Sequence, residues 1–254
     1  MNEGIMASRR WTVFAVAGIL LLGAAIFAGW RWQHETADPA ARLASGDRAA
    51  IEKVVHDYIL DHPEILPQAM ENLQQRENAR LLASIGDAVH TPFPGAVLGN
   101  PDGKVTLVEF TDFACTFCRQ SVAEVEQLIA ANPDLRVVIR ELPILSPQSA
   151  DAARMGLAAA EQGKYPAFHR AMFAAGRPGP ETIAAAAQAA GLDMNRARRT
   201  IADPKVAAEI TRNMDFARKL GINGTPSWVA GDRLLAGAVG KEKLSEAIAQ
   251  ARKG

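Results

Sequence analysis

The sequence predicts an α/β domain whose parallel strands are followed by an inserted α-helical domain. Residues 104–140 read as a strand, a helix and a strand, and two strands joined by a helix are expected to lie parallel with a right-handed crossover. Residues 148–220 form a long alanine-rich stretch with helical periodicity, after which two strand patterns and a helix follow. A chain of 254 residues, 48% of them hydrophobic, is long enough to bury the core of such a domain.

The elements of this domain, which we place at about 95–254, follow from local signals. The turn sequence Asn100–Gly103 separates a short strand at 97–98 from a longer apolar strand. Glycine and proline residues divide the alanine-rich region into several helices. We expect the remaining strands at 104–111, 136–140, 227–229 and 233–235, and helices outside the insertion at 115–131 and 241–251.

A small helical region is expected ahead of this domain, at 49–90. Asp47 is suited to cap its first helix, and the Asp-His-Pro-Glu sequence at 61–64 ends that helix and starts a second. Residues 74–80 are polar on all sides, which indicates a solvated connector to the main domain. The apolar positions at helical spacing are Ile51, Val54, Val55, Tyr58 and Ile59 in the first helix, and Ile65, Leu66, Ala69, Met70 and Leu73 in the second.

Two short helices cannot bury such an apolar stripe by themselves. The stripe must pack on the main domain, on a membrane surface or on copies of itself. We expect self-association, so that residues 49–90 make the protein a homo-oligomer, and docking on its own domain is the alternative. The heptad register is too imperfect to predict a long coiled coil.

Residues 11–30 form an apolar stretch of twenty residues without a charged side chain. This length crosses a bilayer as one helix, and tryptophans lie at both of its ends. Two arginines precede the stretch, so the positive-inside rule places the N-terminus in the cytoplasm and the rest outside it. We expect 1–32 to be a cytoplasmic tip and single-pass inner-membrane anchor, 33–48 a linker, and the folded domain to lie in the periplasm. A cleaved signal peptide is the alternative.

The overall charge is balanced. Lysine and arginine together number 28, and so do aspartate and glutamate, which gives a formal net charge of zero. A nucleic-acid partner calls for a basic surface, so we expect none.

The only two cysteines, Cys115 and Cys118, lie where the strand at 104–111 gives way to the helix at 115–131. This C-x-x-C placement favours thiol–disulfide chemistry, because the N–H groups and the dipole of the helix start stabilise a thiolate on the first cysteine. Cys118 lies most of a turn further on, from where it can attack a mixed disulfide. An inert disulfide is the alternative, but so small a loop removes little chain entropy.

A second motif, Gly221–Pro226, precedes the strand at 227–229, and its sequence favours a cis peptide bond between Thr225 and Pro226. Together with the C-x-x-C and the helices inserted between the two motifs, it resembles the DsbA-type branch of the thioredoxin superfamily over about 95–254. The resemblance implies a thioredoxin fold with an inserted α-helical domain. It also implies that the cis-proline loop faces the cysteines, where Thr225 and Pro226 bind an extended substrate chain.

The resemblance further implies the roles of three side chains. Cys115 is the nucleophile, exposed at the helix start, and Cys118 is the more buried resolving thiol. Glu109, six residues before Cys115, matches the buried acid that exchanges protons with the inner cysteine. Burying a carboxylate is unfavourable, so the alternative is that strand twist lets Glu109 reach solvent or a basic neighbour.

Residues 51–66 are similar to the N-terminal region of ScsC-type proteins, the suppressors of copper sensitivity. Some of these proteins oligomerise through that region and act as disulfide isomerases. The dipeptide between the cysteines, Thr116-Phe117, which we expect to contact substrate, departs from the Pro-His of DsbA-type oxidases and the Pro-Tyr of many ScsC-type proteins. Without a histidine there is one group fewer to stabilise the Cys115 thiolate, so a weaker oxidant than a dedicated oxidase is expected.

We therefore expect a membrane-anchored periplasmic thiol–disulfide oxidoreductase of the isomerase or reductase type, with an oxidase as the alternative. Its expected partners are unfolded or misoxidised client proteins and a membrane redox partner that resets the disulfide. No metal and no cofactor other than the redox-active Cys115–Cys118 disulfide are expected. Cu(I) binding by the two cysteines and a pure scaffold are hypotheses of other classes.

The remaining aromatic and histidine side chains are assigned structural positions. Tyr165, Phe168 and Phe173 are expected in the core of the inserted helices, and Trp228 either in the core or beside the substrate. The histidines show no ligand spacing with the cysteines and are expected on surfaces or helix faces: His34, His56, His62, His90 and His169.

Overall fold

The structure is a computed structural model that describes residues 25–27, 30–31 and 45–253. The predicted membrane anchor at 11–30 and linker at 33–48 lie mostly outside these residues. Among the described residues, no helix combines the length and the apolar character that crossing a membrane requires.

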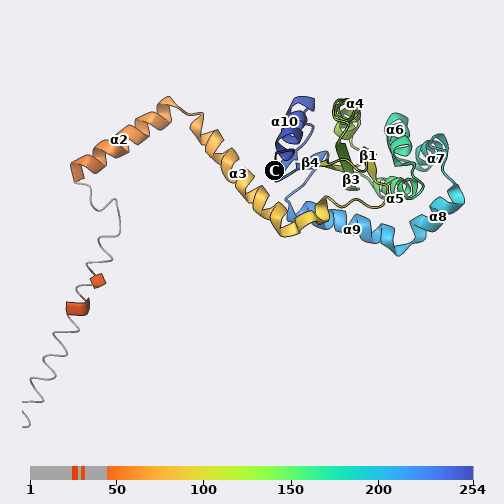
Figure 1. The fold of residues 1–254 in the computed structure, drawn as a ribbon, viewed down its shortest axis with the longest axis horizontal. Coiled ribbons are helices and arrows are strands. Elements are labelled where there is room, and N and C mark those ends of the chain that lie inside the picture. Colours follow the sequence, from red (N-terminus) through yellow and green to blue (C-terminus); the bar gives the residue numbers. More distant parts are fainter. Residues whose placement is uncertain (1–24, 28–29, 32–44, 254) are drawn as a thin grey trace, which may run out of the picture. The chain divides into compact units, whose positions relative to one another are not determined.

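The chain divides into two compact units, the first of which ends at Ala69. Its described part contains α2 (Ser45–Asp61) and the first turn of α3 (Ile65–Ile85), in orange and yellow in Figure 1. The helices separate at 61–64, as the sequence predicts, and the His62 N–H closes the last turn by donating to the Tyr58 carbonyl. The apolar side chains that follow helical spacing along this segment are exposed: Ile51, Val54, Val55, Tyr58 and Leu66, with Met70 and Leu73 further along α3.

The prediction that residues 74–80 form a solvated connector is wrong for one face of the helix, which is buried. The helix α3 continues through these residues to Ile85, and Asn78 and Leu82 are buried. The Asn78 side chain accepts a hydrogen bond from Gln74 one turn earlier, which satisfies part of its polarity inside the helix. Leu82 belongs to a core cluster with residues of the sheet, so this end of α3 is part of the main domain.

The main domain is built on a five-stranded sheet of order β1-β3-β2-β4-β5. The central strands β2 (Val105–Thr111) and β3 (Leu135–Glu141) are parallel, which confirms the predicted strand–helix–strand unit. The remaining strands pair antiparallel with their neighbours in the sheet. The first and last residues of these strands lie within two residues of those predicted from the sequence. They are β1 (Val97–Gly99), β4 (Ser227–Ala230) and β5 (Arg233–Ala236).

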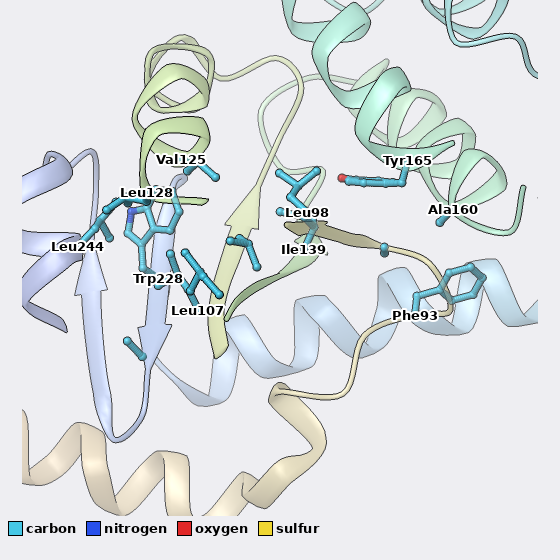
Figure 2. Close-up of a cluster of buried hydrophobic side chains, with 14 of the residues drawn as sticks. Phe93, Leu98, Leu107, Val125, Leu128, Ile139, Ala160, Tyr165, Trp228 and Leu244 are labelled. Carbon is cyan, nitrogen blue, oxygen red and sulfur yellow. The ribbon is translucent and has the colours of Figure 1, made fainter. Parts of the chain in front are cut away.

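Helices cover both faces of this sheet. In Figure 1, α4 (Thr116–Ala131) and α10 (Lys241–Ala251) lie on one side of the strands and α9 (Pro204–Lys219) on the other. Side chains alternate along β2, so Leu107 faces the α4 side and Phe110 the α9 side. On the α4 side, Figure 2 shows one cluster that joins the sheet to both helices: Leu107, Val125, Leu128, Trp228 and Leu244.

The predicted helical insertion forms five helices between β3 and β4. Prolines stand in the first turn of several, and aspartates cap others; Asp193, for example, accepts the N–H groups of Asn195 and Arg196. Phe168 and Phe173 pack in a second core cluster that also contains Cys115 and Cys118, whereas Tyr165 joins the cluster on the α4 side of the sheet. The helices are α5 (Ser149–Ala160), α6 (Tyr165–Ala175), α7 (Pro180–Ala189), α8 (Met194–Ala202) and α9.

A buried arginine fastens the segment after α3 to the sheet. Arg140 of β3 forms an ion pair with Glu209 of α9, with 2.7 Å between Nη1 and Oε1, and both side chains are almost fully buried. Its other N–H groups donate to the backbone carbonyls of Ala88, Val89 and Thr91. Because the guanidinium is satisfied on all sides, this charge can be held in the interior on the α9 face, away from the cysteines.

Candidate functional site

The two cysteines lie at the N-terminus of α4. Cys115 has an extended backbone and occupies the capping position, where its sulfur accepts a hydrogen bond from the Cys118 N–H at 3.2 Å. Asp112, at the end of β2, holds the turn by accepting the N–H of Ala114 on one carboxylate oxygen. The helix N-terminus therefore directs N–H groups at Cys115, as the sequence predicts.

The loop before β4 lies directly on Cys115. The Thr225–Pro226 peptide bond is cis, which confirms the prediction. The Cys115 thiol donates to the Thr225 carbonyl across 3.2 Å, although 110 residues separate the two. The structure thus brings together the two motifs that lie at opposite ends of the domain in the sequence.

The prediction that Cys115 is exposed is wrong. Only 3% of Cys115 is accessible, against 1% of Cys118, because the cis-proline loop covers it from one side and the aromatic core of the inserted helices from the other. The intervening Thr116 and Phe117 are exposed instead, Phe117 to 59%. Of the four residues of the motif, Thr116 and Phe117 are therefore the ones that lie at the surface.

The two thiols differ in acidity. A hydrogen bond from the Cys118 side chain, together with the Thr225 side chain and the N–H groups of Cys118 and Phe117, lowers the pKa of Cys115 to about 6. Burial raises the pKa of Cys118 well above its ordinary value, and the neighbouring Cys115 and Glu109 raise it further. Cys115 is therefore the more acidic of the two thiols and the one that ionises more readily near neutral pH.

Glu109 lies on the same face of β2 as the core that packs against α4, and only 2% of it is exposed. Its burial excludes the alternative in which the side chain reaches solvent. Burial raises the pKa of this carboxyl to about 8. The other side chains that affect this pKa are Thr111, which lowers it, and Cys115, which raises it; neither is basic. The structure thus places a carboxylic acid beneath the cysteine pair.

Three polar side chains near the cysteines were not singled out by the sequence analysis. Asp112, besides its bond to Ala114, accepts the N–H groups of Ile144 and Leu145 at 2.9 Å and so anchors the loop after β3. Glu141, at the end of β3, accepts a hydrogen bond of 2.6 Å from the hydroxyl of Tyr165. Thr111 is fully buried between them on β2. The sequence pattern that could have identified them is a polar residue at the end of an otherwise apolar strand.

Two other expectations are settled by burial. His169, expected on a surface or a helix face, lies on the inward face of α6, where it is 2% exposed and packs edge-on against Phe113 and Phe173. Trp228 lies in the core and donates from its indole nitrogen to the Gly237 carbonyl. Within the described part of the chain, no three histidine, cysteine or acidic side chains are grouped as metal ligands would be.

The lowered pKa of Cys115 predicts its reactivity. Alkylation by a small haloacetamide should rise with a midpoint near pH 6, because the thiolate is the nucleophile and the pKa of Cys115 is about 6. Rates measured by mass spectrometry between pH 4 and 10 test this. A Cys115→Ser variant is the control and should react slowly throughout, and a wild-type midpoint near 9 would contradict the expectation.

Comparison with protein families finds two matches. Residues 106–249 match the DSBA-like thioredoxin domain, and residues 47–80 match the copper resistance protein ScsC N-terminal domain. The first match covers more than half of the chain and contains the cysteines, Thr225 and Pro226. The second covers α2 and much of α3.

Solved structures similar to this chain include a thioredoxin-like oxidoreductase from Silicibacter pomeroyi DSS-3. It is 45% identical, with a TM-score of 0.62 over 66% of this chain and 98% of that one. A linker-deletion mutant of Proteus mirabilis ScsC is 26% identical, with a TM-score of 0.64 over 84% of this chain and 98% of that one. This second likeness extends over a larger share of the present chain.

The chain is also similar to part of longer curated proteins. The Na(+)/H(+) antiporter NhaA 1 of Salinispora arenicola is 32% identical over 161 residues, which make up 62% of this chain and 25% of that protein. The chain thus spans about a quarter of the length of the curated relatives that it matches.

Proposed function

Because the chain belongs to the family of DSBA-like thioredoxin domains, we propose that it is a thiol–disulfide oxidoreductase that exchanges disulfides with client proteins through Cys115 and Cys118. One observation carries the proposal. The Cys115 sulfur is held between the N-terminus of α4 and the Thr225 carbonyl beside the cis-proline, and its pKa is lowered to about 6. These are the conditions for a nucleophilic thiolate that faces a substrate-binding loop.

The reaction follows from the order of the two thiols. The Cys115 thiolate attacks one sulfur of a substrate disulfide, a mixed disulfide forms, and the other substrate sulfur leaves as a thiolate. Cys118 then loses its proton and attacks the Cys115 sulfur, which releases the first substrate sulfur and closes the Cys115–Cys118 disulfide. Two electrons pass from the protein to the substrate, and the reverse sequence oxidises a substrate dithiol.

Within this chemistry we propose a disulfide isomerase or reductase of the ScsC type rather than a dedicated oxidase. The match of residues 47–80 to the ScsC N-terminal domain supports this direction. The Thr116-Phe117 dipeptide supports it too, because it lacks a histidine that would stabilise the Cys115 thiolate and make the disulfide more oxidising. In isomerisation, a second substrate thiolate attacks the mixed disulfide, and Cys115 is released unchanged.

The helices α2 and α3 are proposed to join copies of the chain into a homo-oligomer. Several of their large apolar side chains are exposed, among them Val54, Tyr58 and Leu66. A stripe of this kind is stabilised when a second copy covers it. An oligomer would present several cysteine pairs to one misoxidised client.

We further propose that residues 11–30 anchor the protein in the inner membrane, with the domain in the periplasm. The uncharged apolar stretch and the arginines before it support this placement. The partners in that compartment would be misoxidised client proteins and a membrane redox protein that resets the disulfide.

The direction of electron flow is tested with the full chain. We expect the purified protein to reshuffle a scrambled-disulfide substrate in a weakly reducing glutathione buffer and to oxidise a reduced peptide only slowly. We also expect the Cys115–Cys118 pair to equilibrate with glutathione at a reduction potential between about −120 mV, typical of a strong oxidant, and about −270 mV, typical of thioredoxin. Rapid peptide oxidation without reshuffling would show an oxidase instead.

A further inference from the structure

Thr111 is the last residue of β2 and lies inside the domain. It is 0% exposed, and its hydroxyl oxygen makes no hydrogen bond of normal geometry with any described residue. Buried hydroxyl groups are normally paired, so one that is left without a partner calls for an explanation. Valine has nearly the same shape and would avoid the desolvation of the hydroxyl, yet threonine stands here.

The position of Thr111 places its hydroxyl among the titrating groups of the site. Side chains two apart on a strand share a face, so Thr111 and Glu109 both point to the side of the sheet that α4 covers. Cys118 is buried on the inner side of α4 above them. The Thr111 side chain lowers the pKa of both the Glu109 carboxyl and the Cys118 thiol.

A second carboxyl lies beside Thr111 on the neighbouring strand. Thr111 is paired in register with Glu141 of β3, which is also fully buried. One oxygen of Glu141 is bound by the Tyr165 hydroxyl, and the other has no partner among the described residues. A Cβ on Gly156 of α5 would come within 2.9 Å of the bound oxygen, so the Glu141 carboxyl has little room to move. Thr111 therefore stands in a buried row of proton-carrying groups.

We propose that the Thr111 hydroxyl carries the proton between Cys118 and Glu109 during disulfide exchange, a role that rests on the function proposed above. A hydroxyl can accept one proton and donate another at the same time, which neither a methyl group nor a backbone group can do. This explains why a buried hydroxyl stands here without a fixed partner, since a fixed hydrogen bond would hold it away from one of the two groups.

The step balances in both directions. When Cys118 resolves a mixed disulfide, its S–H proton passes to the Thr111 oxygen, while the Thr111 O–H proton passes to the Glu109 carboxylate. The Cys118 thiolate then attacks the Cys115 sulfur, and the substrate sulfur leaves with the electron pair of the broken S–S bond. In the oxidising direction, a substrate thiolate opens the Cys115–Cys118 disulfide, and the Cys118 thiolate recovers a proton from the Glu109 acid through Thr111.

The test isolates the resolving step. The reduced full chain is mixed with oxidised glutathione; formation of the mixed disulfide at Cys115 is second-order, and its resolution by Cys118 is first-order. Thr111→Val should slow the first-order phase about a hundredfold, the lower end of the usual range of general acid–base effects, and leave the second-order phase unchanged. Thr111→Ser, which keeps the hydroxyl, should resolve the mixed disulfide at close to the wild-type first-order rate. The control is Thr106→Val, the same change on the opposite face of β2, where the hydroxyl that is removed accepts hydrogen bonds from Arg136.

The pH profile separates a proton relay from a structural effect. In the wild type the first-order rate should rise towards pH 8, where the Glu109 carboxyl loses its proton, and in Thr111→Val this rise should be lost. In a Glu109→Gln background, Thr111→Val should have no further effect. The titratable groups that face this point are Glu109 and Asp112 of β2 and its loop, Glu141 of β3, Cys115 and Cys118 of α4, and Tyr165 and His169 of α6.

Each outcome decides one proposal. If the wild type forms no mixed disulfide at Cys115, the proposed function fails. If the wild type resolves its mixed disulfide and Thr111→Val does so with the same rate and profile, only the relay is refuted. Thr111→Ala, which also removes the hydroxyl, replaces the valine variant if that one does not fold, and a normal rate in it would refute the relay equally.

Discussion

Replacing Cys115 by serine is expected to abolish disulfide exchange with every substrate. The reaction starts from the thiolate at the N-terminus of α4, and a serine hydroxyl there is neither ionised near neutral pH nor able to form a disulfide. The measurement is turnover of a disulfide-bonded protein under glutathione, in which the rate with the variant should fall to that of the uncatalysed reaction. The fold should persist, because oxygen replaces sulfur at a capping position that serine favours.

The companion variant Cys118→Ser should behave differently and show the order of the two thiols. Its Cys115 can still attack, but resolution fails, so mixed disulfides with substrate should accumulate and be visible on non-reducing gels and by mass spectrometry. The double variant is the control and should form none. Mixed disulfides in the Cys115→Ser variant, or none in Cys118→Ser, would reverse or refute the assigned roles.

The second large effect is expected on stability, in Glu109→Gln. Burial raises the pKa of the Glu109 carboxyl from 4.5 to about 8, so the folded state binds this proton more tightly than the unfolded state does. Its contribution is fully present below pH 4.5 and is lost as the pH rises through 8. At pH 9 the buried charge should destabilise the wild type by several kcal/mol, because a pKa difference of one between the folded and unfolded states corresponds to about 1.4 kcal/mol.

Glutamine removes this charge, so the variant should be more stable than the wild type at pH 9 and nearly equal to it at pH 4.5. Urea unfolding of both proteins at a series of pH values, under the same reducing conditions, measures the difference. The control Glu246→Gln changes an exposed side chain of α10 and should shift stability by less than about 0.5 kcal/mol. A difference between wild type and Glu109→Gln that does not vary with pH would mean that the carboxyl titrates normally. The same variant should resolve mixed disulfides slowly, because Cys118 loses its proton acceptor.

Local patterns in the sequence were sufficient to predict the elements of the domain and its central topology. Strand Val105–Thr111, helix Thr116–Ala131 and strand Leu135–Glu141 each carry a clear periodicity, and the helix between them leaves only a parallel pairing. The helices of the insertion could be predicted equally well, because prolines, glycines and aspartate caps mark their ends. The Thr225–Pro226 bond could be expected as cis from its local sequence and from family resemblance.

The errors concern burial, which depends on side chains far away in the sequence. Cys115 was expected at the surface because helix N-termini usually are exposed, and only the folded chain brings the Thr225 loop over it. His169 was expected on a surface or a helix face, and only the packing of α6 shows that the face on which it lies is turned inward. The polar run at 74–80 looked solvated because a pattern does not show that Asn78 would be enclosed.

The candidate site residues could be selected before any fold was known: two cysteines at a strand-to-helix junction, a Thr-Pro before a late strand, and an acid within a buried strand. These follow from short-range order along the chain, where spacing sets geometry. Which of these groups meet depends on the folded domain, which places the Thr225 carbonyl on the Cys115 thiol and aligns Thr111 with Glu141 on neighbouring strands. Strand register and helix packing bring together groups distant in sequence, and the dry environment they create shifts the pKa of each group.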